Sequence, residues 1–529
     1  MSAPAVYASH QEGVSGVRTA PLDRWTLSLL LLGAIALAAG VAVIDELAVG
    51  VVKDDGMYVV LARALASGQG YRYLNLPSTP AATHFPPGYP ALLAVVSLLV
   101  PRFPANLLAF KLVNAALLAA GAVLVARLLR GRIDSDRLAL GIGMVSAASV
   151  PLLVLSSMVM SEPLFLAMVL ALLAALERFV MGPASWRGAL VLGAGIGLCM
   201  LVRSHGIVLI PAALFMLVPR RRWRDAAVLT AAAVVCVLPW QWWSAHHAGD
   251  LPAPLLGAYG PYTSWWVRGL REMGPEMIPR TLAKTVPELA SMLVALFSPL
   301  RTTPAPLATL LAFGALGTAA IVAYWRRLPV TLLFLGGYVA IVAIWPFAPT
   351  RFVWGIWPLV LLLPALGMHA ALCRREWPRF ARGVLVVAFA WLAAGYGAYE
   401  LRAVRGSWWS SIARANTRRI DATTRWILTH STPDQVIATD DEEAVFLYTG
   451  RRTVPIISFT AMHYLVEHDP ARNAEEGLVP VLARYPVDLV VVGSAQSFAV
   501  ARFLANQPAP SIALREMFAG GAAFTVLPK

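Results

Sequence analysis

Long apolar runs recur between residues 25 and 401, and they limit the fold of this chain more than any other feature. Lipid offers the backbone no hydrogen-bond partner, so a spanning helix needs about 20 mostly apolar residues. Ten runs meet this requirement: 25–44, 106–128, 138–156, 163–180, 188–206, 225–243, 305–324, 329–347, 352–372 and 383–401. A shorter run, 207–218, directly follows the run 188–206 and would complete a pair of crossings with it. We therefore predict a mainly α-helical, polytopic membrane protein with about eleven transmembrane helices.

Composition supports this interpretation, and the distribution of charge indicates the orientation of the chain in the membrane. Of the 529 residues 58% are hydrophobic and only 14% are charged, which excludes a soluble cytosolic enzyme. Much of the net charge of +14 sits in four arginine clusters: Arg127, Arg130, Arg132 and Arg137; Arg220, Arg221, Arg222 and Arg224; Arg326 and Arg327; and Arg374, Arg375, Arg379 and Arg382. Cytoplasmic loops carry the excess of Lys and Arg, and all four clusters fall there if the N-terminus is inside. The charge therefore requires no nucleic acid partner.

This orientation also predicts the domain organisation. Residues 1–24 form a cytoplasmic tail and residues 25–401 a transmembrane domain. Three segments lie outside: 45–105, 244–304 and the residues after 401. Within the first, the apolar stretch Ala91–Val100 is too short to span, so we expect a juxtamembrane helix on the outer surface. The preference for Arg over Lys is typical of a bacterium with GC-rich codons. We expect this multi-pass chain to lie in the bacterial inner membrane.

Residues 402–529 have a different pattern and predict a small extracytoplasmic α/β domain. The expected elements are an amphipathic helix at 411–430, strands at Gln435–Thr439, Thr453–Ile457 and Asp488–Gly493, and helices at 441–449 and 475–484.

Two adjacent carboxylates, Asp54 and Asp55, follow the first apolar run on the outer side. Two acids beside a membrane surface are difficult to desolvate together, so at least one is expected to meet a proton, a metal or a cationic partner. The alternative is that one of them caps the helix expected through Leu65, because Asp is a favoured N-cap residue.

Two further outer-side residues have both a functional and a structural interpretation. His84 begins a stretch with prolines at positions 86, 87 and 90, a rigid turn that could hold the imidazole or could be purely structural. Glu162 precedes Pro163 at the start of an apolar run. Its carboxylate either favours the positive end of a helix dipole or faces the first acid pair across a cleft.

Arg203 and Arg351 stand at the outer ends of apolar runs. A guanidinium there costs free energy unless it snorkels or pairs with an anion, and its forked donors suit a phosphate. We favour function for Arg203, whereas snorkelling is a fair alternative for Arg351. Acids and cations at the outer lipid boundary together suit a lipid-linked phosphosugar.

In order and sidedness, these motifs resemble those of the C-type glycosyltransferases, multi-spanning enzymes that use polyprenyl-phosphate sugars. Asp54-Asp55-Gly56-Met57-Tyr58 resembles the Asp-Glu-x-x-Tyr motif of the protein O-mannosyltransferase and aminoarabinose transferase branch, with Asp in place of Glu. His84-Phe85-Pro86-Pro87-Gly88 resembles its Lys-Pro-Pro-Leu element, with His in place of Lys. Glu162 stands where the second outer loop carries an acid, and Arg203 where a Lys or Arg precedes Gly. The resemblance covers roughly residues 25–360.

The resemblance implies a hexosyl- or pentosyltransferase that moves a sugar from a polyprenyl phosphate to a lipid, glycan or protein acceptor, with inversion. Three roles are implied: catalysis for Asp54, Asp55 and Glu162; donor-phosphate binding for Arg203, Arg351 and His84; and acceptor or sugar contact for Tyr58 and Lys53. Asp54 is the expected general base. Asp55 and Glu162 could also hold a divalent metal such as Mg, Mn or Zn, because hard cations prefer oxygen ligands.

Two other classes of protein remain open on the sequence. A secondary transporter or lipid flippase would use the same charges along a translocation path, which should place ionisable residues near the bilayer midplane. The middles of the assigned spans are almost free of charge. A membrane receptor with an outer binding domain would leave Arg203 and Glu162 without a purpose.

Overall fold

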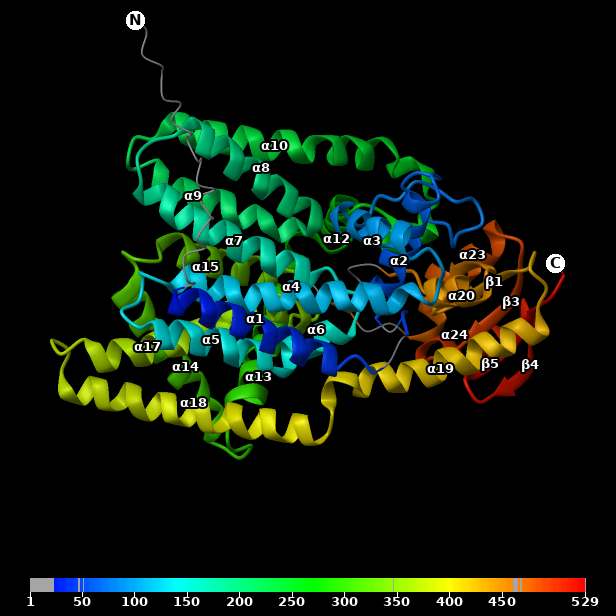
Figure 1. Ribbon diagram of the computed structural model, residues 1–529. Coiled ribbons are helices and arrows are strands. Elements are labelled where there is room, and N and C mark those ends of the chain that lie inside the picture. The colour runs from blue at the N-terminus through cyan, green and yellow to red at the C-terminus, as the bar shows by residue number, and fades with distance from the viewer. Residues whose placement is uncertain are drawn as a thin grey trace, which may run out of the picture.

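The chain folds into a helical bundle with a small sheet domain at one end, as Figure 1 shows for this computed structural model. The structure describes residues 23–45, 48–50, 52–345, 347–459, 465–466 and 469–528. The predicted tail 1–24 lies almost wholly outside the described residues. The C-terminus lies at the far end of the sheet domain (Figure 1).

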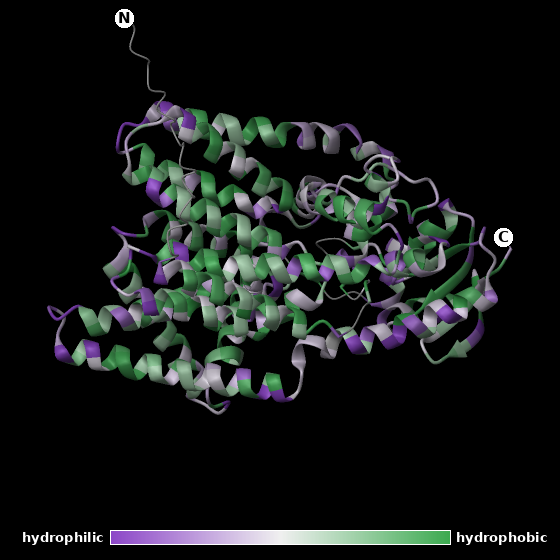
Figure 2. Ribbon diagram, in the orientation of Figure 1, coloured by the Kyte–Doolittle hydropathy of each residue, from purple (hydrophilic) through white to green (hydrophobic). Residues whose placement is uncertain are grey.

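Each predicted apolar run falls on one or more helices of the bundle. These helices are α1 (Arg24–Ala42), α4 (Asn106–Leu129), α5 (Asp136–Ala148), α6 (Val150–Ser157), α7 (Glu162–Met181), α8 (Trp186–Val202), α9 (Leu209–Leu217), α10 (Trp223–His246), α14 (Ala305–Tyr324), α15 (Pro329–Ile344), α17 (Trp357–Cys373) and α18 (Arg379–Arg405). Apolar residues run along them, while polar residues gather at the ends of the bundle and along the sheet domain (Figure 2). The prediction of a mainly helical protein is confirmed.

Among the described helices, six are long and apolar enough to cross a membrane, or seven if the bent pair α5 and α6 forms one span. The axes of that pair differ by 51°. Four shorter apolar helices, α8, α9, α15 and α17, coincide with other predicted spans. The coarse prediction of a multi-pass membrane protein is confirmed, whereas the number of eleven crossings stays a prediction.

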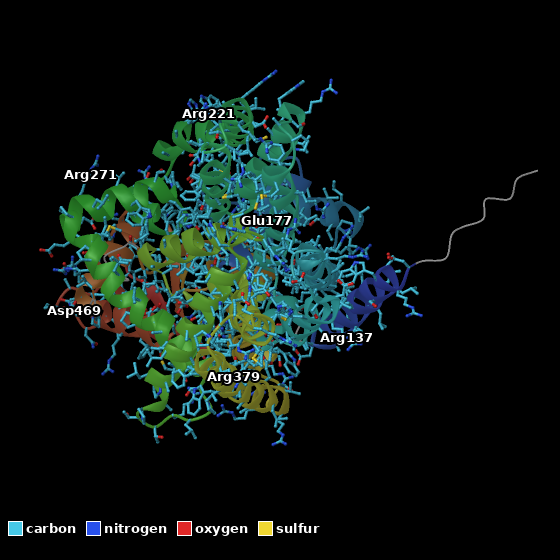
Figure 3. The ribbon with its side chains drawn as sticks, turned by 90° about the vertical axis from the view of Figure 1, so that its left-hand side faces the viewer. Arg137, Glu177, Arg221, Arg271, Arg379 and Asp469 are labelled. Atoms are coloured by element: carbon cyan, nitrogen blue, oxygen red, sulfur yellow. The ribbon has the colours of Figure 1, made fainter. Side chains whose placement is uncertain are left out.

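The arginine-rich loops lie at the end of the bundle opposite the sheet domain (Figure 1). Figure 3 looks onto this end, where Arg137, Arg221 and Arg379 stand around the rim and Glu177 lies nearer the centre. The Glu177 carboxylate is buried and accepts hydrogen bonds from the N–H and hydroxyl of Thr331, both at 2.8 Å. The positive loops thus share one end, as the assignment of crossings requires.

Glycine allows a close helix contact in the bundle, between α8 and α10. A Cβ at Gly193 would lie 2.2 Å from the carbonyl oxygen of Leu229 and 2.8 Å from the Cβ of Ala232. Small residues at membrane helix interfaces permit this close approach of backbones. The backbone oxygen cannot move aside as a flexible side chain would, so this position has no room for a methyl group.

Gly193→Ala is accordingly expected to destabilise the protein by about 1–3 kcal/mol, because the helices must separate to relieve the overlap. The measurement is the midpoint of thermal unfolding of the detergent-purified protein. Gly141→Ala is the matched control, since a Cβ at this helical position meets nothing within 4 Å. Gly141→Ala should leave the midpoint unchanged or raise it slightly. An equal response of the two variants would contradict the packing argument.

The sheet domain begins with α19 (Trp408–His430), the predicted amphipathic helix. Its strands are β1 (Val436–Thr439), β2 (Arg452–Pro455), β3 (Val487–Val492), β4 (Ile512–Phe518) and β5 (Gly521–Val526), in the spatial order β2-β1-β3-β5-β4. β1 pairs parallel with β2 and β3, and β5 pairs antiparallel with β3 and β4. Its other α-helices within the described residues are α20 (Glu442–Thr449), α22 (Pro470–Asn473), α23 (Val479–Arg484) and α24 (Ala495–Ala505). The first three strands were predicted, and the β4–β5 hairpin was not.

Several shorter elements fill the junction between bundle and sheet domain. They are α2 (Asp54–Ala66), α3 (Gly88–Leu99), α11 (Leu256–Tyr259), α12 (Tyr262–Met273) and α16 (Thr350–Trp354). The longer helix α13 (Met277–Phe297) packs against α14, α15 and α18 of the bundle. Helix α3 corresponds to the predicted juxtamembrane helix but begins three residues earlier. It exposes Val95, Leu98 and Leu99. Figure 1 shows α2 beside α20, so the first outer segment contacts the sheet domain.

Candidate functional site

Asp54 is the first residue of α2, and a strained turn presents it. Lys53, the residue before it, has φ 64° and ψ −59°. The N–H of Asp54 donates to the carbonyl of Val52 at 2.7 Å, which makes a γ-turn centred on Lys53. A positive φ is unfavourable for a residue with a side chain, and such strain concentrates at functional sites. The N-cap position of α2 is Lys53, without a side-chain cap, so Asp54 is not an N-cap residue.

Asp55 has a different environment from its neighbour. Among the described residues, its carboxylate accepts the backbone N–H groups of Gly50 at 3.1 Å, Val52 at 3.1 Å and Gly56 at 3.0 Å. The side chain is 1% exposed. Asp55 therefore holds the loop before α2 in place, while Asp54 faces the other way.

Two arginines and two acids from separate elements meet at the outer end of the bundle. Arg351 on α16 donates from Nη2 to Asp54 Oδ2 at 2.5 Å, and its Nε lies 3.1 Å from Glu162 Oε1. Arg203, at the C-cap of α8, has its Nη1 2.9 Å from the same Glu162 oxygen. Glu162 is fully buried, whereas the side chains of Asp54 and Arg351 are partly exposed. The structure thus brings together four residues that the sequence separates widely.

Tyr58 joins this group through Ser161. The Tyr58 hydroxyl and Ser161 Oγ are 3.0 Å apart, and Arg203 Nη1 donates to Ser161 Oγ at 3.0 Å. Tyr58 lies one helical turn after Asp54, so both residues belong to the same face of α2. This hydroxyl pair ties α2 to the start of α7.

His84 is buried beside the second outer segment. Its Nδ1–H donates to the carbonyl of Gly260 at 2.6 Å, and its ring packs on Tyr262 with centroids 4.0 Å apart. Burial lowers the pKa of His84, which opposes a fixed positive charge. The imidazole therefore offers its other nitrogen as a neutral group.

Lys53 connects the site to the sheet domain. Its Nζ lies 2.9 Å from Glu442 Oε1, at the start of α20. The Tyr259 hydroxyl donates to the same oxygen at 3.3 Å and accepts from Asn75 at 3.0 Å. Burial alone would lower the pKa of Lys53, but the charges of Glu442 and Glu443 outweigh it and raise the pKa. Three outer segments are therefore joined by one polar network.

These residues surround a cavity of about 720 Å³ between the bundle and the sheet domain. Its lining includes the predicted site residues Lys53, Asp54, Tyr58, His84, Arg203 and Arg351. Glu162 lies behind the two arginines, and neither it nor Asp55 lines the cavity. Lys53, Arg203 and Arg351 lie on the bundle side, and a run of acids, Asp440–Glu443, lies on the sheet side together with Arg419.

The predicted metal ligands do not fit a metal ion. Asp55 is taken up by backbone N–H groups, and the near oxygen of Glu162 is taken up by two guanidinium groups. Across the residues that the structure describes, no group of three or more His, Cys, Asp or Glu side chains is arranged to hold a metal.

Sequence reasoning missed the sheet-side half of the cavity. Four consecutive acids, Asp440–Glu443, stand in a chain of which only 14% is charged, and this run was the available signal. Ser161 and Tyr259 had no such signal, because their roles depend on contacts between distant segments.

No family model and no curated protein matches the sequence. Solved structures do match the fold. ArnT from Cupriavidus metallidurans bound to undecaprenyl phosphate is 14% identical, with a TM-score of 0.58 over 95% of this chain and 100% of that chain. The oligosaccharyltransferase AglB from Archaeoglobus fulgidus, in complex with an inhibitory peptide and a dolichol-phosphate, is 13% identical, with a TM-score of 0.52 over 89% of this chain and 70% of that chain. An Archaeoglobus fulgidus oligosaccharyltransferase complex with Zn and sulfate has a TM-score of 0.50 at 13% identity, over 89% of this chain and 69% of that chain. This chain therefore has the fold of the C-type glycosyltransferases.

Proposed function

We propose that the protein is a membrane glycosyltransferase that moves a hexosyl or pentosyl group from a polyprenyl phosphate to an acceptor. The observation that carries the proposal is the cavity, because it places the partly exposed Asp54 carboxylate beside the Arg351 guanidinium at one end of a membrane bundle. Similarity of fold to proteins solved with undecaprenyl phosphate and dolichol-phosphate supports a lipid-phosphate donor. The arginine-rich loops at the opposite end support an extracytoplasmic site in an inner membrane.

In this mechanism the acceptor oxygen attacks the anomeric carbon of the donor sugar. The new bond between the acceptor oxygen and the anomeric carbon forms as the bond from that carbon to the phosphate oxygen breaks. Asp54 takes the acceptor proton as general base, and the bonding electron pair leaves with the phosphate. Attack opposite the leaving group inverts the anomeric carbon.

Arg351 stabilises the charge that develops on the phosphate, through donors positioned before the reaction. We assign this role to Arg351 rather than to Arg203 because the Arg351 side chain is 30% exposed, whereas that of Arg203 is 8% exposed. Arg203 supports Glu162 and Ser161 from behind, and Glu162 holds both guanidinium groups in place. Neutral His84 contributes a hydrogen bond rather than a charge, and Asp55 acts on the loop rather than on substrate.

Binding of the lipid phosphate tests this function directly. The purified protein in nanodiscs is incubated with undecaprenyl phosphate or with undecaprenol, and retained lipid is measured by native mass spectrometry. We expect retention of the phosphate and at least tenfold less retention of the alcohol, because the arginines recognise the anionic head. Equal retention of the two lipids, or retention of neither, would contradict the proposal and favour a transporter of other substrates.

A further inference from the structure

The sheet domain presents the carboxyl ends of its parallel strands to the cavity. Strands β1, β2 and β3 end at Thr439, Pro455 and Val492, and the residues after these ends line the same space as Asp54. In sheets with parallel strands, ligands bind in the crevice outside these ends, where loops diverge. The sheet domain is therefore a wall of the cavity rather than an appendage.

Two of the four acids on this side of the cavity, Asp440 and Asp441, already bind other groups of the protein. The Asp440 carboxylate accepts the N–H groups of Gly493 at 3.0 Å and Ser494 at 2.8 Å, which fixes the loop after β1 to the loop after β3. Asp441 is held by both terminal nitrogens of Arg419. These contacts make the crevice rigid and use the binding capacity of both groups.

The other two acids can still accept hydrogen bonds. Glu442 and Glu443 are 0% and 1% exposed. Glu442 Oε2 and Glu443 Oε1 have no hydrogen-bond partner among the described residues, although both residues line the cavity. A buried carboxylate oxygen without a donor costs free energy, and native proteins rarely leave such groups unpaired. This arrangement points to a ligand that brings hydrogen-bond donors.

We propose that Glu442 and Glu443 form a subsite for the neighbouring hydroxyl groups of a saccharide. This inference rests on the proposed function and specifies the class of ligand that contacts the sheet-domain side of the cavity. A carboxyl group has two oxygens at a spacing suited to adjacent hydroxyls, and each can accept a hydrogen bond. Burial and the adjacent Glu442 raise the pKa of Glu443, so in its protonated form it both donates and accepts, as a hydroxyl requires.

Two features favour a saccharide over a cationic ligand. The ammonium of Lys53 already lies 2.9 Å from Glu442, and Arg419 already neutralises Asp441, so the cationic positions are filled from within the chain. Aromatic rings of Tyr262, Trp345 and Phe459 line the same cavity and offer apolar surface to a ligand. Apolar walls with a few convergent polar groups are typical of small-molecule sites.

The saccharide could belong to the acceptor or to the donor, and two arms of one experiment separate these sources. In the first, saturation-transfer NMR measures binding of neutral disaccharides to nanodisc-embedded protein, with ethanolamine as the cationic probe. In the second, native mass spectrometry compares retention of undecaprenyl-phosphate glucose, mannose and arabinose with that of bare undecaprenyl phosphate. Each arm uses wild type, Glu443→Leu, Glu443→Gln and the control Glu475→Gln, whose side chain is exposed on the sheet domain.

For an acceptor subsite, Glu443→Leu should weaken disaccharide binding at least tenfold and Glu443→Gln less, because an amide still binds hydroxyls. For a donor-sugar subsite, Glu443→Leu should remove the preference for glycosylated over bare lipid. Unchanged values for both Glu443 variants in both arms, or binding of ethanolamine alone, would overturn the subsite. Retention of bare undecaprenyl phosphate reports on the proposed function separately, so the two failures are distinguishable.

Discussion

Asp54→Asn is expected to lower sugar transfer by about 10²- to 10⁴-fold, the usual contribution of a general base. Asparagine keeps the size of the side chain and can still accept a hydrogen bond from Arg351, but it cannot take the acceptor proton. Removing the negative charge beside Arg351 also leaves that guanidinium less neutralised, so retention of undecaprenyl phosphate should stay equal or increase. The measurement is release of undecaprenyl phosphate from a panel of its glycosylated forms in vesicles that also hold candidate acceptors.

The matched control for this variant is Asp250→Asn. Asp250 is an acid of the second outer segment that pairs with His247 at 2.7 Å and does not line the cavity. The Asp250→Asn variant should transfer sugar at the wild-type rate. Wild-type transfer by Asp54→Asn, with lipid retention intact, would remove the base role from Asp54 and leave the cavity as a binding site alone.

The apolar pattern was sufficient to predict the helices of the bundle, because lipid-length runs allow few other structures. It also predicted which loops share an end, since the arginine clusters follow the parity of the crossings. The pattern could not predict the break between α5 and α6 at Ser149, because the run 138–156 has no polar interruption long enough to mark a bend of 51°.

Sidedness alone placed Asp54, Glu162, Arg203 and Arg351 at the outer lipid boundary, and the structure brings all four together. The division between Asp54 and Asp55 was not predictable in the same way. Adjacent helical positions differ by about 100° in direction, so the packing of α2 and the turn before it decide which carboxylate faces the cavity. A positive φ at a lysine has no sequence signature, because it is stabilised by contacts from elsewhere.

The sheet domain was predicted as far as its buried parallel strands, whose apolar runs are clear. The β4–β5 hairpin was not predicted because β4, Ile512–Phe518, is an edge strand whose residues are mostly exposed. Exposed edge strands lack the apolar alternation that signals a half-buried strand. The contacts that dock this domain onto the bundle join distant residues, among them Lys53 and Glu442, 389 residues apart. No local pattern reports such a contact.

Arg351→Ala should reduce transfer by about 10²- to 10³-fold, as expected when a donor aimed at developing charge is lost. It should also weaken retention of undecaprenyl phosphate by about 10- to 100-fold, the range for a charge-assisted hydrogen bond. Arg351→Lys should recover little, because one ammonium cannot bridge Asp54 and Glu162 as the forked guanidinium does. Lipid retention is measured by native mass spectrometry and transfer by release of lipid phosphate.

Arg351→Ala is expected to weaken lipid retention and Asp54→Asn is not, and this contrast separates a base from a phosphate-binding residue. Loss of Asp54 removes a negative neighbour of the phosphate, whereas loss of Arg351 removes its cation. Arg203 is less suited to this comparison, because it is 8% exposed and its removal would disturb buried Glu162. Arg280→Ala is the matched control, since Arg280 is exposed and pairs with Glu276 at 2.9 Å away from the cavity. If Arg351→Ala retained the lipid as wild type does while Arg280→Ala did not, the phosphate would bind elsewhere.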